Sequence, residues 1–254
     1  GKTLSGTLGQ VTKVETKENG LSQPLPYDLT ELQRVANQLY QYSAKKTLSL
    51  VQSLYESHKA VSYPRTDSKY LPKDIASAMK DRLDAVAGFD PKAKEYLKTG
   101  SQVKLTSVFN DSKVTDHYAL IPTEESPRVD RMSSDEVKIY RLIVERFLGL
   151  FADKHITQTV KATVEFAGNH FVFRQEQVLQ AGWKTSEGKA AEIVDWQKLK
   201  TIKGNFQVNQ ELTSPPKLAT EGSLLAQMEK YSLGTPATRA EIIEKLIKSE
   251  LMER

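Results

Sequence analysis

The chain has 254 residues, 39% of them hydrophobic and 27% charged, which is typical of a globular protein with a substantial core. It contains no cysteine, which excludes disulfides and thiolate metal sites, and no apolar run approaches the ~18–20 residues that span a membrane. The net charge is +4, and residues 43–73, with six basic and two acidic side chains, account for it. A basic segment suits a polyanionic substrate, although an ordinary solvated surface is the alternative.

Two parts of the chain have the pattern of β-strands. Residues 1–26 are extended in character, and Asn19-Gly20 predicts a hairpin-type turn within them. From His155 apolar and polar residues alternate with a period of two, and short strands are also expected near Ile202–Leu212. We expect the N-terminal ribbon to pair antiparallel with these distant strands.

The period becomes helical at Leu29, where apolar residues recur every three or four positions. Ser43 has the character of an N-cap, which predicts a second helix to about Ser57. Pro72 is placed to begin a third helix that runs to about Ala87. These stripes predict a helical core.

Val103–Phe109 is predicted to be a strand, and further helices are expected after it. Ser133 and Glu136 then form a capping-box pattern for a helix to about Asp153. Near the end, Thr235 followed by proline predicts the start of a helix that runs to about Lys248.

The octet VSYPRTDS, residues 61–68, holds the candidate chemistry. Pro64 disfavours helix at Tyr63, and in an extended chain residues i and i+2 face the same side, so Tyr63 and Arg65 can face one ligand. A tyrosine hydroxyl is a poor nucleophile at neutral pH, but a fixed cation favours its ionised form and binds phosphate oxygens. The octet therefore fits tyrosine attack on a phosphodiester; an ordinary loop remains the alternative.

Lys45 and Lys46 lie in the first turn of the helix that Ser43 begins. Cations are unfavourable beside the positive end of a helix dipole unless an anion also binds there. The pair therefore indicates a phosphate contact or simple surface lysines. His117 is one of four histidines, and by itself is more simply a structural residue.

Four segments in order resemble type IA DNA topoisomerases, and most of all their bacterial topoisomerase III branch. They are DLTELQRVANQLYQYSAKKTLSLVQSLYE, SYPRTDSKYLP, DHYALIPT and LGTPATRAEIIEKLI. The resemblance covers most of residues 24–254 and is weakest in about 155–215. It implies an α+β fold in which a β-rich hinge module is interrupted by a mainly helical module carrying the tyrosine. We expect domains at 1–28 with 152–214 (hinge), 29–151 (helical) and 215–254 (start of a helical DNA-groove domain).

The resemblance also implies an activity. The parent enzyme would cleave and rejoin single-stranded DNA through a 5′-phosphotyrosine ester, and pass a strand through a gate to change linking number or decatenate DNA. The catalytic residues would be Tyr63 and Arg65. The implied DNA-binding residues are His117, Lys45, Lys46, Thr66, Ser68, Thr123, Thr235, Thr238 and Arg239.

The family's Asp-x-Asp-x-Glu metal pattern does not occur in this sequence. Because the first residues, GKTLSGTLGQ, also lack an initiating methionine and a signal-peptide pattern, we expect a piece of a longer chain. Mg²⁺ would be bound by a preceding domain, with no metal or other cofactor in this piece, which should be inactive alone. We expect a monomeric, cytoplasmic, nucleoid-associated protein.

Two other readings fit parts of the sequence. One is a non-catalytic single-stranded DNA-binding module. The other is a different phosphotyrosine-forming strand transferase, a recombinase or relaxase. Recombinases need a dispersed Arg-His-Arg set before a late tyrosine, and relaxases need paired metal-binding histidines; here Tyr63 is early and the histidines are scattered.

Overall fold

The structure is a computed structural model that describes residues 4, 6–184 and 194–253. It divides into a sheet unit, residues 1–23 and 153–216, and a helical unit, residues 24–152 and 217–254. The mixture of helix and antiparallel sheet confirms the predicted α+β class. Positions 1–3, 5 and 185–193 of the expected hinge domain, and the last residue of the C-terminal part, lie outside the described residues.

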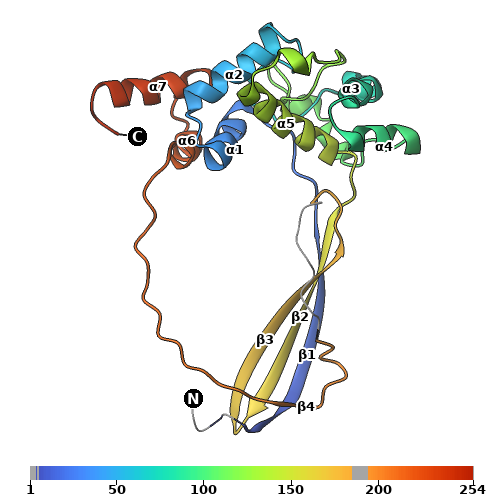
Figure 1. Cartoon of the computed structure of the whole chain (residues 1–254), viewed down its shortest axis with the longest axis vertical. Coiled ribbons are helices and arrows are strands. Elements are labelled where there is room, and N and C mark those ends of the chain that lie inside the picture. The colour runs from blue at the N-terminus through green and yellow to red at the C-terminus, as the bar shows by residue number, and fades with distance from the viewer. Residues whose placement is uncertain (1–3, 5, 185–193, 254) are drawn as a thin grey trace. The chain divides into compact units, whose positions relative to one another are not determined.

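The sheet unit contains four antiparallel strands in the order β3-β2-β1-β4 (Figure 1). Their bounds are β1 Leu8–Leu21, β2 His155–Phe166, β3 Asn169–Gln180 and β4 Thr201–Lys203. The predicted pairing of the N-terminal ribbon with distant strands is confirmed. The predicted turn at Asn19-Gly20 is wrong, because β1 continues through it and places Asn19 opposite Thr157.

Alternation along β2 builds the core of this unit. Ala162, Val164 and Phe166 are fully buried on one face, and Trp196 covers them. Gly9 on β1 allows the close approach of Phe166, since a Cβ there would lie 2.4 Å from the ring. The strands therefore form a small core of their own rather than a surface hairpin.

The helical unit contains seven α-helices among its described residues (Figure 1). They are α1 Leu29–Tyr40, α2 Ala44–Glu56, α3 Met79–Val86, α4 Pro91–Thr99, α5 Ser134–Gly149, α6 Glu221–Lys230 and α7 Pro236–Lys248. Four 3-10 turns accompany them: η1 Lys73–Ala78, η2 Thr106–Val108, η3 Asp111–Lys113 and η4 Val129–Arg131. One apolar core joins these helices, with Leu29, Leu32, Val51 and Phe147 fully buried.

Side-chain caps fix several helix starts as the sequence predicts. The Ser43 hydroxyl accepts the Lys46 N–H, and Ser133 and Glu136 complete a reciprocal capping box at α5. The helix after Ser133 ends at Gly149, four residues earlier than predicted.

Two predicted elements differ in the structure. The helix expected from Pro72 begins as the 3-10 turn η1 and becomes α-helical only at Met79. The strand expected at Val103–Phe109 is instead an irregular segment containing η2, whose single ladder contact is a bridge between Leu71 and Phe109. The Lys104 N–H donates to the carbonyl of Leu150, at the end of α5, and so has a helix end rather than a neighbouring strand as its hydrogen-bond partner.

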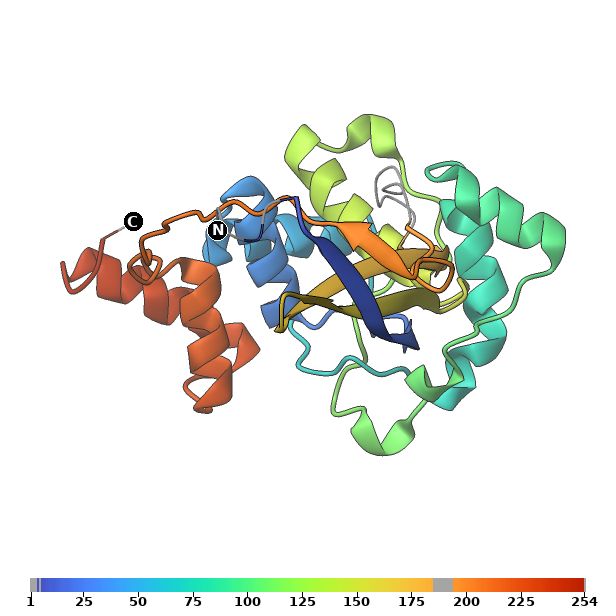
Figure 2. The same cartoon turned by 90° about the horizontal axis from the view of Figure 1, so that it is seen from below.

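The C-terminal helices pack inside the helical unit. α6 contacts α1, and α7 contacts α2 and α6. Figure 2 shows the C-terminal helices, at the red end of the colour scale, next to the blue helices. Leu225, Met228 and Ile243 supply buried side chains to this packing. Residues 217–254 therefore lie in the same compact unit as the tyrosine segment.

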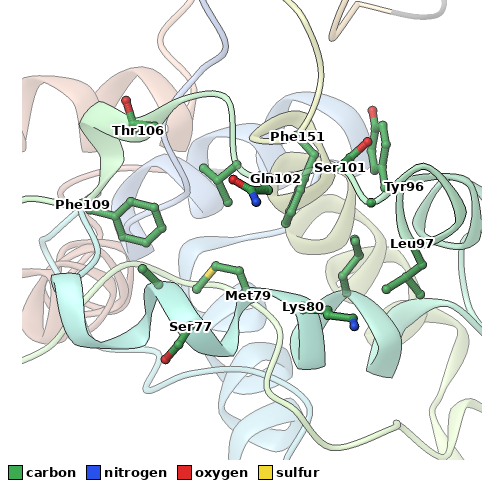
Figure 3. A pocket seen from close by; sticks show the side chains of 14 residues that line it. Ser77, Met79, Lys80, Tyr96, Leu97, Ser101, Gln102, Thr106, Phe109 and Phe151 are labelled. Atoms are coloured by element: carbon green, nitrogen blue, oxygen red, sulfur yellow. The ribbon is translucent and has the colours of Figure 1, made fainter.

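A pocket of about 590 Å³ lies between η1, α3, α4 and the segment that follows α4 (Figure 3). Apolar side chains form much of its wall, among them Met79, Leu97, Phe109 and Phe151. None of the residues expected to bind DNA lines it. The candidate site lies elsewhere in the unit.

Candidate active site

The segment that carries Tyr63 follows α2 and pairs with a second irregular segment. The Ser62 N–H donates to the Ile121 carbonyl over 2.9 Å, and the Ile121 N–H donates to the Ser62 hydroxyl over 3.0 Å. The same hydroxyl donates to the Ala119 carbonyl over 2.9 Å. Because Ser62 is buried and fully engaged, the residue before Tyr63 is fixed.

Two rings flank the half-buried Tyr63. The His117 ring centroid lies 4.1 Å from that of Tyr63, with 36° between the planes. Tyr55, from the last turn of α2, meets the same ring edge-on, with centroids 5.5 Å apart. His117 is exposed, so the structure brings together the candidate nucleophile and the predicted histidine at an accessible surface.

Arg65 is exposed beside this pair. Its Nη2 donates to Oε1 of Gln52 over 3.3 Å, and Gln52 in turn donates to Glu56 over 2.8 Å. Both partners lie on α2, so the helix that ends near Tyr63 also holds the arginine. The guanidinium has no acidic partner among the described residues, which leaves its charge available to an anion.

Thr66, Ser68 and Thr123 have protein partners. The Thr66 hydroxyl donates to the His117 carbonyl over 3.1 Å, and Ser68 Oγ donates to the Lys113 carbonyl over 2.8 Å. Thr123 Oγ1 donates to the Lys59 carbonyl over 2.6 Å. These side chains tie the tyrosine segment to its neighbours, and a role for them in DNA binding stays a prediction.

The start of α2 receives carboxylates from the chain itself. The Ala44 N–H donates to Glu221 over 2.8 Å, and Lys46 Nζ lies 2.6 Å from Asp135. Lys46 also lies over the Tyr42 ring, 4.0 Å from its centroid. Side chains of the same molecule thus occupy the place where the sequence suggested a phosphate.

The basic segment is only half compensated. Lys46, Lys69 and Lys73 pair with acidic side chains. Lys45, Lys59 and Arg65 are exposed and have no acidic partner in the part of the chain that the structure describes. Lys59 and Arg65 lie close to Tyr63 in the sequence, whereas Lys45 is in the first turn of α2, at the opposite end of the helix from Tyr55.

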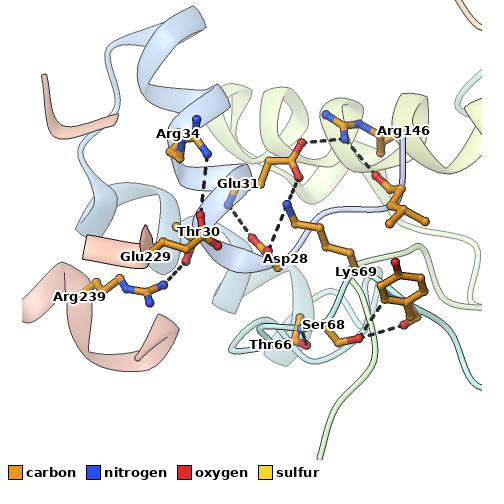
Figure 4. Close-up of polar contacts among 12 residues, drawn as sticks. Asp28, Thr30, Glu31, Arg34, Thr66, Ser68, Lys69, Arg146, Glu229 and Arg239 are labelled. Carbon is orange, nitrogen blue, oxygen red and sulfur yellow. Dashed lines mark hydrogen bonds and ion pairs between the residues drawn. The ribbon is translucent and has the colours of Figure 1, made fainter. Parts of the chain in front are cut away.

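Thr235, Thr238 and Arg239 lie at the start of α7. The Thr235 N–H donates to Oγ1 of Thr238 over 2.8 Å, so the two threonines cap the helix. Arg239 is only 6% exposed, and its Nη1 donates to Thr30 of α1 over 2.8 Å (Figure 4). The guanidinium is engaged with the protein, while the threonines are exposed.

Comparison with known proteins identifies the family. The model of a DNA topoisomerase family matches residues 2–254, which is nearly the whole chain. This chain belongs to the type IA DNA topoisomerase family.

Similar proteins carry topoisomerase names. The chain is 38% identical over 285 residues to DNA topoisomerase 3 of Shouchella clausii, and 37% identical over 290 residues to that of Bacillus subtilis. Both alignments cover 100% of this chain, which spans 39% of the length of these relatives. The full-length topoisomerase I of Thermotoga maritima matches with a TM-score of 0.72 at 21% identity, over 97% of this chain and 42% of that one, which is a likeness of fold.

Sequence reasoning missed Gln52 and Tyr55 as neighbours of the topoisomerase motif. Both lie in the last two turns of α2, which ends at Glu56 before the chain reaches Tyr63. A helical projection shows only that Gln52 and Tyr55 share one face of α2, because residues three apart lie on the same side of a helix. Their contact with Arg65 and Tyr63 depends on tertiary structure and has no local signal.

Glu136 lies behind this face of α2, where it accepts the Ser53 hydroxyl over 2.6 Å and approaches His58 at 3.3 Å. Burial pushes its pKa upward, but hydrogen bonds from Ser53 and Ser133 outweigh burial and lower the pKa to about 2. The carboxylate is therefore ionised at neutral pH and holds α5 to α2.

The described residues do not fit a metal site. Within them, no group of three or more His, Cys, Asp or Glu side chains could hold an ion. The same part of the chain contains no helix long and apolar enough to cross a membrane.

Proposed function

We propose that the whole protein of which this chain is a part is a DNA topoisomerase that cleaves and rejoins single-stranded DNA through Tyr63. The observation that carries the proposal is the contact of the Tyr63 ring with His117, beside the uncompensated Arg65. The family membership of the chain supports it.

In the proposed reaction, the Tyr63 oxygen attacks a backbone phosphorus and loses its proton. A bond forms between phosphorus and the tyrosine oxygen, and the bond to the 3′ oxygen breaks. The leaving 3′ oxygen takes up a proton, and the 5′-phosphate stays on the tyrosine. The ester conserves the bond energy, so the free 3′-hydroxyl can reverse the step without a nucleotide cofactor.

Arg65 and His117 would act on the phosphate. Charge that develops on the phosphate oxygens is stabilised by a fixed cation, and an Arg65 fork can hold two of these oxygens. His117 can donate to a phosphate oxygen or move a proton at the reacting oxygens. Lys45 and Lys59, which are also uncompensated, would contact the neighbouring backbone.

The finer points of the proposal follow the family resemblance. The protein would act as a monomer on nucleoid DNA in the cytoplasm, and pass a second strand through the break. It would depend on Mg²⁺ held by residues outside this chain. The predicted domains, with the β-strands as a hinge, belong to the same proposal.

A trapping experiment on the full-length protein tests the proposal. A single-stranded oligonucleotide labelled at its 3′ end should transfer its label to the protein, whereas a 5′ label should be released with the other fragment. Tyr63→Phe should abolish transfer yet bind the oligonucleotide within about twofold, because only the hydroxyl is lost.

Tyr70→Phe is the matched control, since Tyr70 loses only a hydroxyl that accepts from Lys113. It should trap like the unaltered protein. Label transfer by Tyr63→Phe, or transfer of the 5′ label, would contradict the assignment. Binding without any transfer by the unaltered protein would favour a non-catalytic DNA-binding module.

A further inference from the structure

The first turn of α1 is a meeting point for three other segments of the helical unit (Figure 4). Asp28 and Glu31 contact Lys69, which follows the tyrosine segment. The Thr30 hydroxyl accepts a hydrogen bond from Arg239 of α7, and Glu31 also forms an ion pair with Arg146 of α5. One helical turn, anchored by the fully buried Leu29, therefore connects these parts.

Lys69 is held by two carboxylates. Its Nζ lies 2.7 Å from Glu31 and 3.5 Å from Asp28, and its side chain is 33% exposed. Burial lowers the pKa of Lys69, but the hydrogen bond that its ammonium donates to Glu31 and the charge of Asp28 outweigh burial and leave the pKa above its ordinary value. The ammonium is thus charged and committed to protein partners, unlike the free Lys45 and Lys59.

The carboxylates differ in their environment. Burial acts to raise the pKa of Glu31, yet Lys69 and Arg146 together hold it below its ordinary value. Burial dominates at Asp28, whose pKa is raised even though its side chain accepts the Glu31 N–H at the N-cap. Removal of Lys69 would leave these two neighbouring carboxylates with too little positive charge.

The same turn of α1 touches the tyrosine segment a second time. The Leu29 N–H donates to the Thr66 carbonyl over 3.1 Å, three residues after Tyr63. Residues 66–69 are therefore attached to the start of α1 at both ends, through the Thr66 carbonyl and the Lys69 ammonium. The opposite side of the stretch is held through Ser68, whose hydroxyl donates to the carbonyl of Lys113 at the end of η3.

We propose that Lys69 is a positioning residue for DNA cleavage: its double contact with Asp28 and Glu31 holds the segment that carries Tyr63 and Arg65 in register with α1. The proposal rests on the proposed function of Tyr63. A displacement of about 1 Å at a reacting group can slow a reaction about 100-fold, so a side chain outside the reacting atoms can control the rate.

A direct phosphate contact is the competing role for Lys69. A pocket of about 600 Å³ borders Lys69 and is also lined by Arg34, Gln38 and Ser223, where DNA backbone could lie. A phosphate contact would change the affinity for DNA, whereas positioning would change the rate in the bound complex. Affinity and rate can be measured separately.

The experiment compares Lys69→Gln with Lys69→Arg in the full-length protein. Adduct formation is followed in single turnover at saturating 3′-labelled oligonucleotide, and Kd is measured by fluorescence anisotropy. Lys69→Gln should form adduct about tenfold more slowly with Kd within about twofold. Lys69→Arg, which keeps a charged donor for both carboxylates, should recover most of the rate.

Arg146→Gln is the matched control, because it removes the other partner of Glu31 without touching the tyrosine segment. It should lower the melting temperature while leaving the bound rate unchanged. If Lys69→Gln is unfolded at the assay temperature, Glu31→Gln replaces it, and a slower bound rate with unchanged Kd is again expected.

Three results would overturn the proposal. They are a weakened Kd with an unchanged bound rate, unchanged rate and affinity, and equal slowing by Arg146→Gln. Loss of adduct formation in the unaltered protein, or its persistence in Tyr63→Phe, would instead contradict the proposed function, so the two failures are distinguishable.

Discussion

The imidazole of His117 lies against the ring of Tyr63, with 4.1 Å between centroids and 36° between planes. The Thr66 hydroxyl donates to the His117 carbonyl and the Ser62 hydroxyl donates to the Ala119 carbonyl, so the two segments are joined on both sides of this contact. The position of the histidine relative to the candidate nucleophile is therefore set by the fold.

Replacement of His117 should slow adduct formation about 100-fold, the scale of a lost acid–base group. His117→Phe keeps an aromatic ring against Tyr63 but removes both nitrogens, whereas His117→Ala removes the packing as well. Both variants should be slow at saturating oligonucleotide in single-turnover trapping. Normal rates in His117→Phe would show that the ring only packs.

Arg65→Lys should slow cleavage at least about tenfold although the charge is kept, because a point charge does not replace a planar fork. The lysine side chain is also shorter than that of arginine, so the hydrogen bond to Gln52 would be altered. Trapping rates give the measurement. Arg128→Lys, at an exposed arginine paired with Asp130, is the matched control and should be normal.

Binding of single-stranded DNA by this chain should weaken as salt rises. Three uncompensated cations, Lys45, Lys59 and Arg65, predict a slope of about −2 in a plot of log K against log salt, at ~0.7 per phosphate. Lys45→Gln should reduce the slope by about 0.7, whereas Lys198→Gln, at a lysine paired with Asp195, should not. Fluorescence anisotropy across a salt series measures both, and a flat profile would exclude phosphate contacts.

Acid should destabilise the helical unit through Glu136. Its folded pKa of about 2 lies below the ordinary 4.5, so its contribution is present above pH 4.5 and is lost as the pH falls towards 2. The loss should be on the order of 2 kcal/mol. Urea unfolding at pH 7 and pH 3 should show a larger difference for the unaltered chain than for Glu136→Gln; equal differences would contradict the ionised, hydrogen-bonded carboxylate.

Local chemistry made part of the fold predictable. The Ser133–Glu136 capping box and the Ser43 cap are satisfied within one turn, so the sequence alone specifies these helix starts. The alternation after His155 likewise identified β2. The Asn19-Gly20 turn signal failed because a long partner strand was available, and pairing with it continues to Leu21.

The site was predictable only where residue type carries the chemistry. Tyr63 and Arg65 can be recognised in the sequence, but the sequence does not show which lysines and arginines pair with acidic side chains. Lys69 has the same local appearance as Lys45, and only tertiary structure shows that Lys69 faces two carboxylates. Arg239 is similar, because its acceptor on Thr30 comes from the other end of the chain.

The pairing of β1 with β2 affects how the chain is made on the ribosome. Leu21 pairs with His155, so β1 leaves the ribosome on the order of 10 s before its partner strand, while α1–α5 are synthesised. The contacts among α1–α5 close over shorter loops, and we expect them to form first. During that interval β1 is an unpaired strand with two open edges, and it is the stretch that a chaperone would have to shield.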